Sequence, residues 1–270
     1  MRRGLAESRE RAQADIAARR VLVAGSLATK SATQVAGDQP IELLGPPPRF
    51  VGRGGEKLDA ALDHFGVEVA GLRCIDAGAS TGGFTDCLLQ RGAAEVVAVD
   101  VGYGQLHERL RTHSRVHNLE RTNVRSLTPD AIGGAGQVVV ADLSFISLTT
   151  VAPALLSLLD GDAGRLVALV KPQFEAGRAE AARGRGVIRS TAVWRRVLGE
   201  VAEAAASLGA TMMDAMVSPL TGADGNVEFL VHVVPDGASA TGPLAGPVVD
   251  LDAVVAEAAA RHGAALPEGT

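Results

Sequence analysis

Residues 76–84 read Asp-Ala-Gly-Ala-Ser-Thr-Gly-Gly-Phe, and they join a short apolar run to a segment with helical periodicity. Glycine lets the backbone pass close to a ligand, and the first turn of a helix offers free N–H groups. The spacing Gly-x-x-x-Gly-Gly differs from the Gly-x-Gly-x-x-Gly of dinucleotide sites, which makes a dinucleotide the less favoured ligand. The loop alone also fits a tight strand-to-helix turn that binds nothing.

Strands and helices alternate on both sides of this loop. Leu58, Ala61, Leu62 and Phe65 recur at i, i+3, i+4 and i+7, which predicts a helix before the first strand. The alternation predicts an α/β fold with a doubly wound, mainly parallel sheet, whose ligand site lies beyond the carboxyl ends of the strands. The clearest predicted strands cover residues 73–76, 96–100, 138–142, 166–170 and 227–233, and the clearest helices between them cover 84–90, 149–159 and 192–208.

Polar side chains follow several of these strand ends. Asp100 ends the second strand, about 20 residues after the loop, where a carboxylate can accept hydrogen bonds from both ribose hydroxyls of a nucleoside cofactor. An acid at a strand end often only caps the next helix, but the nearby glycine loop favours the ligand role. Asn123-Val124 follow a third strand that is less clearly marked than these, and Asp142-Leu143 follow the fourth, which covers residues 138–142.

The composition fits one ordinary domain with a small appendage. The 270 residues are 47% hydrophobic, mainly Ala, Val and Leu, which suits Val-rich strands covered by Ala-rich helices. Cys74 and Cys87 lack metal-ligand spacing, so we expect both to be small buried apolar residues and expect no metal. The apolar stretch 138–159 contains an aspartate and a proline, and the chain starts with charged residues. We therefore expect a cytoplasmic protein without a membrane span or signal peptide.

The Gly-Pro-Pro-Pro run at 45–48 cannot continue a helix or a central strand and predicts a boundary. Before it, Ser8 can cap a short helix, and residues 21–23, 27–28 and 41–43 predict short strands. Residues 1–57 hold ten Lys/Arg against six Asp/Glu, although the whole chain carries a net charge of −5. This part can therefore present a basic face to RNA phosphates, and its predicted RNA contacts are Arg2, Arg9, Arg19, Arg20 and Arg53.

The order of the glycine loop and the polar strand ends resembles the S-adenosylmethionine (SAM) sites of class I methyltransferases. The resemblance implies that Asn123-Val124 contact the adenine and that Tyr103 covers part of the cofactor. The residues that it assigns to SAM are Asp76, Gly78, Ala79, Ser80, Gly82, Gly83, Phe84, Asp100, Val101, Tyr103, Asn123, Val124, Asp142 and Leu143.

Four residues, one of which is Asp142 from the SAM set, resemble the Lys-Asp-Lys-Glu tetrad of ribose 2′-O-methyltransferases of the FtsJ type. They are Lys57 in Gly-Gly-Glu-Lys, Asp142 in Ala-Asp-Leu-Ser, Lys171 in Val-Lys-Pro-Gln-Phe-Glu and Glu228 in Gly-Asn-Val-Glu. Each alone could be a solvated lysine or an ordinary ion-pair carboxylate. Together they predict a catalytic set in which Lys171 is the candidate base that removes the proton from a ribose hydroxyl.

The full motif series resembles the TlyA family, described as ribosomal RNA cytidine 2′-O-methyltransferases and historically also as haemolysins. The resemblance implies ribosomal RNA, within ribosomal subunits, as the partner. It divides the chain into an S4-like RNA-binding domain (1–45), a Pro-rich linker (46–52), an FtsJ-like methyltransferase domain (53–235) and a Gly/Ala/Pro-rich tail with one weak helix (236–270).

This chain differs from the TlyA family at two points. It has Phe50 where the family has tryptophan, and relatives carry further residues before the first S4 helix, which we expect to be shortened here. Two other functions stay open: an RNA-binding ribosome-assembly factor without catalysis, and a membrane-lytic protein. The second is disfavoured because the sequence shows neither a spanning segment nor a strongly amphipathic cationic helix.

Overall fold

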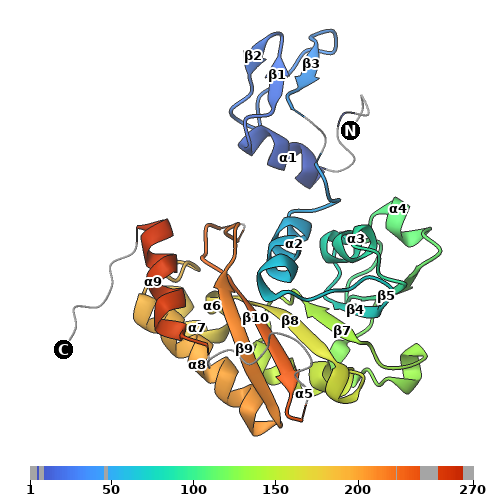
Figure 1. Ribbon diagram of the computed structural model, residues 1–270. Coiled ribbons are helices and arrows are strands. Elements are labelled where there is room, and N and C mark those ends of the chain that lie inside the picture. The colour runs from blue at the N-terminus through green and yellow to red at the C-terminus, as the bar shows by residue number, and fades with distance from the viewer. Residues whose placement is uncertain (1–4, 6–8, 46–47, 223, 238–248, 264–270) are drawn as a thin grey trace. The chain divides into compact units, whose positions relative to one another are not determined.

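The computed structural model describes residues 5, 9–45, 48–222, 224–237 and 249–263. The chain divides into two compact units between Arg49 and Phe50 (Figure 1). Each unit has its own sheet.

The first unit is a three-stranded antiparallel sheet with one helix. Helix α1 (Arg9–Ala17) precedes β1 (Val21–Val23), β2 (Ser26–Leu27) and β3 (Ile41–Leu43), and the strand order is β2-β1-β3. The three strands correspond to the three short runs predicted from the sequence, with β2 one residue earlier. Ser8, the predicted helix cap, lies outside the described residues.

The second unit is built on a seven-stranded sheet in the order β6-β5-β4-β7-β8-β10-β9. The strands β4 to β8 are parallel to one another, while β10 is antiparallel to both of its neighbours. This arrangement confirms the predicted doubly wound, mainly parallel α/β sheet. The strands are β4 (Arg73–Ala77), β5 (Glu95–Val99), β6 (Val116–Leu119), β7 (Val138–Ala141), β8 (Arg165–Val170), β9 (Ala210–Val217) and β10 (Phe229–Pro235).

Two details of this sheet differ from the sequence analysis. Strand β9 was not predicted, because its buried and exposed residues are mixed along an edge strand. Strand β10 begins at Phe229, so Val227 and Glu228 belong to the connection that leads into it. Glu228 therefore lies at the edge of the sheet where the parallel strands end.

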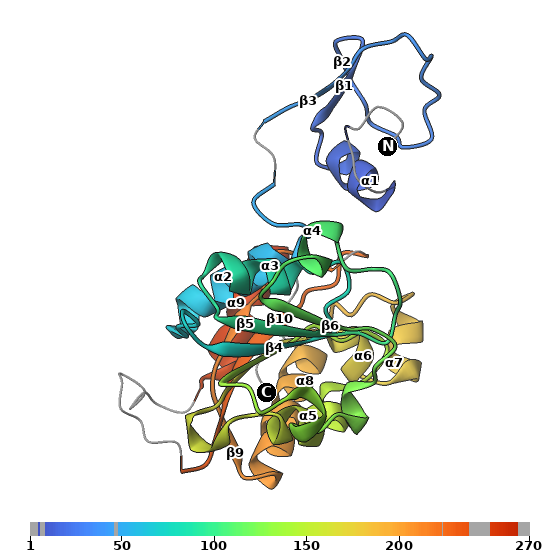
Figure 2. The same ribbon diagram turned by 90° about the vertical axis from the view of Figure 1, so that its right-hand side faces the viewer.

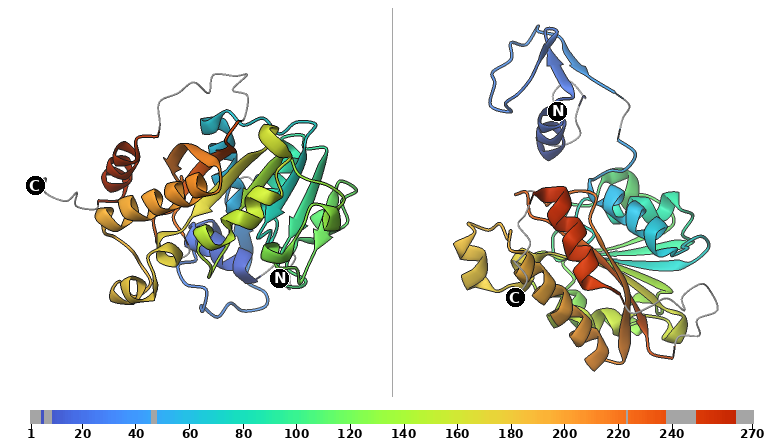
Figure 3. Two further views of the ribbon diagram at one scale, coloured as in Figure 1. Left: turned by 90° about the horizontal axis from the view of Figure 1, so that it is seen from below. Right: turned by 60° about the vertical axis from the view of Figure 1, so that its left-hand side comes forward.

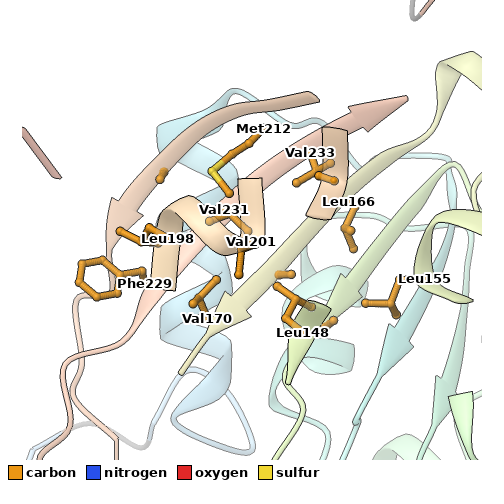
Figure 4. Close-up of a cluster of buried hydrophobic side chains, with 14 of the residues drawn as sticks. Leu148, Leu155, Leu166, Val170, Leu198, Val201, Met212, Phe229, Val231 and Val233 are labelled. Carbon is orange, nitrogen blue, oxygen red and sulfur yellow. The ribbon is translucent and has the colours of Figure 1, made fainter. Parts of the chain in front are cut away.

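Helices cover both faces of the sheet, as Figures 2 and 3 show. On one face, α2 (Gly54–Phe65) and α3 (Gly83–Gln90) pack with alternate strand residues such as Cys74 and Val96. On the other face, α5 (Leu148–Ser157) and α8 (Thr191–Ser207) pack with Ile75 and Val97. Figure 4 shows part of this second core, where side chains of α5 and α8 meet those of β8, β9 and β10. The remaining helices are α4 (Glu108–Arg111), α6 (Pro172–Glu175), α7 (Arg178–Arg183) and α9 (Leu251–His262).

Helix α9 belongs to the second unit's core, although the sequence analysis assigned it to a tail. Its Leu251, Val254, Val255 and Ala258 are buried in the cluster that contains α8. Figure 3 shows α8 and α9 side by side. The Asp250 carboxylate caps this helix by accepting hydrogen bonds from the N–H groups of residues 252 and 253.

Among the described residues, both cysteines are buried and neither forms a disulfide. Burial, with a smaller effect of Asp76, raises the pKa of Cys74 to about 12. In the described part of the chain, no three His, Cys, Asp or Glu side chains come together as metal ligands. None of the described helices is long and apolar enough to cross a membrane.

Candidate functional site

The carboxyl ends of four parallel strands surround a cavity of about 450 Å³. This volume lies within the roughly 300–1,000 Å³ that is usual for small-molecule sites. The predicted cofactor residues that line it are Gly78, Ser80, Asp100, Val101, Asn123, Val124, Asp142 and Leu143. The other predicted cofactor residues, Asp76, Ala79, Gly82, Gly83, Phe84 and Tyr103, are not part of its wall.

Asp100 is held rigidly at the wall of the cavity. Its Oδ2 accepts a hydrogen bond from the N–H of Ser80 at 2.8 Å, and its Oδ1 accepts one from the N–H of Gly102 at 2.7 Å. Each carboxylate oxygen has a further lone pair that can accept from a hydroxyl. A preorganised carboxylate of this kind fits the predicted contact with the ribose hydroxyls of a nucleoside.

Each glycine of the loop lies close to a different neighbouring group, which leaves no room for a side chain. A Cβ on Gly78, which has φ +90°, would lie 2.5 Å from the backbone oxygen of Asp142. A Cβ on Gly82, which has φ +98°, would instead meet the side chains of Leu110 and Leu106 at 2.3 and 2.8 Å. Packing beneath the loop therefore leaves no room for a side chain at Gly82, and its contact with a cofactor stays a prediction.

Gly83 allows two helices to approach each other. A Cβ at this position would lie 2.9 Å from the backbone nitrogen of Gly55 in α2. The same contact brings α2, which carries Lys57, close to the first turn of α3. The glycine loop thus positions the cavity wall and the helix that supplies a predicted catalytic lysine.

Asp76 of β4 is fully buried. Its Oδ2 accepts a hydrogen bond from the Thr85 hydroxyl at 2.6 Å, while its Oδ1 has no hydrogen-bond partner among the described residues. Burial raises the pKa of Asp76 to about 7, Thr85 opposes the shift, and the charges of Asp142 and Asp100 add to it. Asp76 therefore joins β4 to α3 from within the core.

The raised pKa of Asp76 predicts a pH-dependent stability. Its folded pKa of about 7 exceeds the ordinary 3.8, so the folded state binds more protons between these values, and the free energy of unfolding should fall as pH rises through this window. Asp76→Asn keeps an acceptor for Thr85 and should remove this contribution. Denaturant titrations of both proteins from pH 4 to 8 measure the difference. A constant difference across that range would contradict a buried, titrating Asp76.

The cavity wall includes Asn123 and Val124, the two residues predicted to contact the adenine. The Asn123 Oδ1 accepts a hydrogen bond from the N–H of Arg125 at 3.0 Å, which fixes the side chain and leaves its amide NH₂ as a potential donor. Tyr103 is 69% exposed, and the guanidinium of Arg121 lies 4.2 Å from the centre of its ring. Tyr103, which was predicted to cover part of the cofactor, is thus exposed, stacks with Arg121 and lies outside the cavity wall.

Several cavity residues were missed by the sequence reasoning: Val99, Gln105, Thr122, Ser144, Phe145, Ile146 and Val151. Most of them lie beside predicted residues in the sequence, and this adjacency was the signal that could have identified them. Phe145 is 91% exposed with φ +65°, and its ring centre lies 5.1 Å from that of Phe174. An exposed aromatic side chain in a left-handed conformation is not encoded by any local pattern.

The predicted catalytic residues form two ion pairs. Lys57 pairs with Glu228, and these side chains are 9% and 3% exposed. Lys171 Nζ lies 2.5 Å from Asp142 Oδ1 and donates a hydrogen bond to the hydroxyl of Ser144 at 3.0 Å. Asp142 and Ser144 both line the cavity, so the Lys171 pair lies at its edge.

The sheet register explains why these four residues meet. Phe229 of β10 lies opposite Val170 of β8, so Glu228 and Lys171 are the next residues outward on adjacent strands. Asp142 follows directly after β7, the other neighbour of β8. A Cβ on Gly54, at the start of α2, would lie 3.9 Å from Asp142 Oδ2, so the helix that carries Lys57 adjoins the second pair.

Glu175 links the cavity to a helix start and was given no role from the sequence. Its carboxylate accepts hydrogen bonds from the N–H of Leu148 at 2.7 Å and from the Ser147 hydroxyl at 2.5 Å. Burial raises the pKa of Glu175, while these hydrogen bonds lower it. This cap holds the start of α5 directly after the cavity residues 144–146.

The predicted RNA-binding residues fall in different environments. Arg53 donates to the carbonyl of Thr221 at 2.7 Å and so ties the start of α2 to the loop before Glu228. Arg20 donates to the carbonyl of Leu44, and Arg19 is exposed. Arg2 and the side chain of Arg9 lie outside the described residues.

Comparison with known proteins gives a consistent set of relatives. The FtsJ-like methyltransferase family matches residues 50–234. The chain is 50% identical over 232 residues to the 16S/23S rRNA (cytidine-2'-O)-methyltransferase TlyA of Mycobacterium tuberculosis, with 86% of each chain covered. It is 38% identical to Hemolysin A of Brachyspira hyodysenteriae over 86% of this chain and 95% of the relative. A solved structure from Streptococcus thermophilus, which carries a provisional hemolysin name, is 39% identical to this chain. The match covers 95% of this chain and 92% of that structure, with a TM-score of 0.75.

Proposed function

Because this chain belongs to the FtsJ-like methyltransferase family, we propose that it transfers a methyl group from SAM to a ribose 2′-hydroxyl of ribosomal RNA, with cytidine as the target nucleoside. The observation that carries the proposal is the Lys171–Asp142 pair at the edge of a cavity of nucleoside-cofactor size. The relative that is 50% identical is named for this reaction, which supports the choice of substrate.

The residues around the cavity fit SAM. The fixed Asp100 carboxylate would accept from the ribose hydroxyls, and the apolar side chains of Val124, Leu143 and Ile146 would surround the adenine. A Cβ on Gly78 would contact the backbone that carries Asp142, so the cavity floor depends on this glycine. When bound, SAM supplies a methyl group that its positive sulfonium already activates for transfer.

The chain's own task is to align the ribose and to remove one proton. The neutral amine of Lys171 would accept the proton of the 2′-hydroxyl as the new O–C bond forms and the S–C bond breaks. Asp142, 2.5 Å from that amine, fixes its position and stabilises the ammonium that results. The buried Lys57–Glu228 pair lies beside it and would orient the ribose hydroxyls.

Mapping of 2′-O-methylated positions in ribosomal RNA tests this function in cells. Ribosomal RNA from cells without the protein should lack at least one 2′-O-methylcytidine that is present when the protein is supplied. The wild-type chain should restore that position, and Lys171→Ala should not. Restoration by Lys171→Ala would instead support an RNA-binding assembly factor without catalysis.

A prediction concerns the cofactor contact of Asp100. Asp100→Ala should weaken SAM binding by about 1–3 kcal/mol because charge-assisted hydrogen bonds to the ribose are lost, and this is roughly 5- to 150-fold in the dissociation constant. Calorimetric titration of SAM measures the change. Asp130→Ala, which removes a carboxylate outside the cavity wall, should leave binding unchanged. An unaltered dissociation constant in Asp100→Ala would exclude Asp100 from the site.

A further inference from the structure

The connection between β8 and α8 carries an unusual concentration of positive charge. Residues 177–190 contain four arginines and a single acidic residue, Glu180, whereas the whole chain has a net charge of −5. Arg183, Arg185 and Arg189 are exposed, and we name residues 183–189 the arginine segment. Neither the glycine loop nor the Lys-Asp-Lys-Glu set accounts for this segment.

The arginine segment is anchored next to the proposed catalytic residues. The buried side chain of Asn226 accepts a hydrogen bond from the N–H of Ile188 at 2.9 Å and donates one to the carbonyl of Gly186 at 2.7 Å. Asn226 precedes Glu228 by two residues. The segment also follows β8, which ends beside Lys171, and it joins α7 to α8 (Figure 1).

The anchors lie between the two arginines that remain available. Arg185 directly precedes Gly186, and Arg189 directly follows Ile188. The indole N–H of Trp194 donates to the Ile188 carbonyl at 3.1 Å, so this part of the backbone is fixed from inside the core. Neither Arg185 nor Arg189 forms a side-chain hydrogen bond or an ion pair with any described residue.

The backbone of Arg185 has φ +52°, a left-handed conformation that is costly for a residue with a Cβ. A Cβ on its neighbour Gly184 would lie 2.0 Å from the Val187 carbonyl oxygen, so the turn is tight at this point. Strained residues of this kind are held only where the surrounding contacts determine them, and they concentrate at functional sites. Here the strain places an uncompensated guanidinium at the protein surface.

We infer that Arg185 and Arg189 bind backbone phosphates of the substrate RNA beside the nucleotide that enters the catalytic cleft. Guanidinium groups bind phosphate in a bidentate manner, and their position on a segment held by Asn226, two residues before Glu228, fits an RNA strand that crosses the site. The inference rests on the proposed RNA substrate. It adds a phosphate contact on the methyltransferase unit that is separate from the basic residues of the first unit.

Binding of the full-length protein to ribosomal RNA from cells that lack it tests the inference. The affinity is measured at several KCl concentrations between about 50 and 200 mM, a range over which each phosphate contact contributes about 0.7–0.9 to the slope of log K against log salt. Arg185→Gln/Arg189→Gln should lower that slope by about 1.5. Arg185→Lys/Arg189→Lys should retain most of it, because lysine keeps the charge.

The matched control is Arg261→Gln, which removes a guanidinium from the last turn of α9 that pairs with Glu257. Asp252, near the start of α9, pairs with Arg195, near the start of α8. Arg261 lies about 13 Å further along α9 than Asp252. This control should keep the wild-type slope, and SAM affinity should be unchanged in all variants. A wild-type slope in the Gln double variant would overturn the inference. Failure of the proposed function would appear differently, as wild-type protein that binds RNA but forms no 2′-O-methyl group.

Discussion

Lys171→Ala should lower the single-turnover rate of methyl transfer by about 10²-fold or more, the range of general-base catalysis. The amine of Lys171 contacts Asp142 and Ser144 at the edge of the cavity, while Asp100 and the glycine loop form a different part of the wall. The affinities for SAM and RNA should therefore stay within a few-fold of wild type. Rapid-quench measurement with saturating enzyme separates the chemical step from binding.

Lys171→Arg distinguishes a proton acceptor from a simple positive charge. A guanidinium keeps its proton at accessible pH, so this variant could still pair with Asp142 but could not act as a base. We expect it to be as slow as Lys171→Ala. A rate near wild type in Lys171→Arg would show that Lys171 supplies charge or position only, and deprotonation would then be reassigned to Asp142, Lys57 or water.

Deletion of residues 1–44 should lower the affinity for ribosomal RNA by roughly tenfold or more and should reduce its salt dependence, because phosphate contacts from Lys and Arg control both. The second unit has its own sheet and two hydrophobic cores, so the truncated protein should fold and bind SAM as the full chain does. Filter binding at several salt concentrations, together with SAM titration, measures both properties.

A point variant provides the control for this deletion. Arg19→Gln removes one exposed charge from the first unit and should reduce the salt slope by about 1 without loss of the unit. If the truncated protein methylated intact ribosomal subunits as efficiently as the full chain, the proposed RNA-binding role of the first unit would be wrong.

The strand ends were predictable because each combines a short apolar run with a polar residue directly after it. Asp100 and Asp142 are of this kind, and the structure places both at one cavity. The pairing of Lys171 with Asp142 and of Lys57 with Glu228 could not be predicted, because it depends on the register of strands far apart in the sequence. The arrangement of a parallel sheet fixes which strand ends are neighbours, and local periodicity carries no such information.

Other differences have separate physical causes. Strand β9 is an edge strand whose polar Asp214 interrupts a period-two pattern. Helix α9 buries two alanines together with its larger apolar residues, which gives a weak sequence signal for a helix that is part of the core. Gly82 matches the glycine of a ligand-binding loop, yet the side chains that exclude a Cβ there come from residues 106 and 110.

The most direct test of the central claim is nucleoside analysis of ribosomal RNA methylated in vitro. Purified protein is incubated with isotopically labelled SAM and ribosomal subunits from cells that lack it, and the RNA is then digested to nucleosides and separated by mass spectrometry. The account predicts label in 2′-O-methylcytidine, absent when the Lys171→Ala variant replaces the wild type. Label in a base-methylated nucleoside or in ribosomal protein, or no transfer to any subunit by a protein that binds SAM, would contradict it.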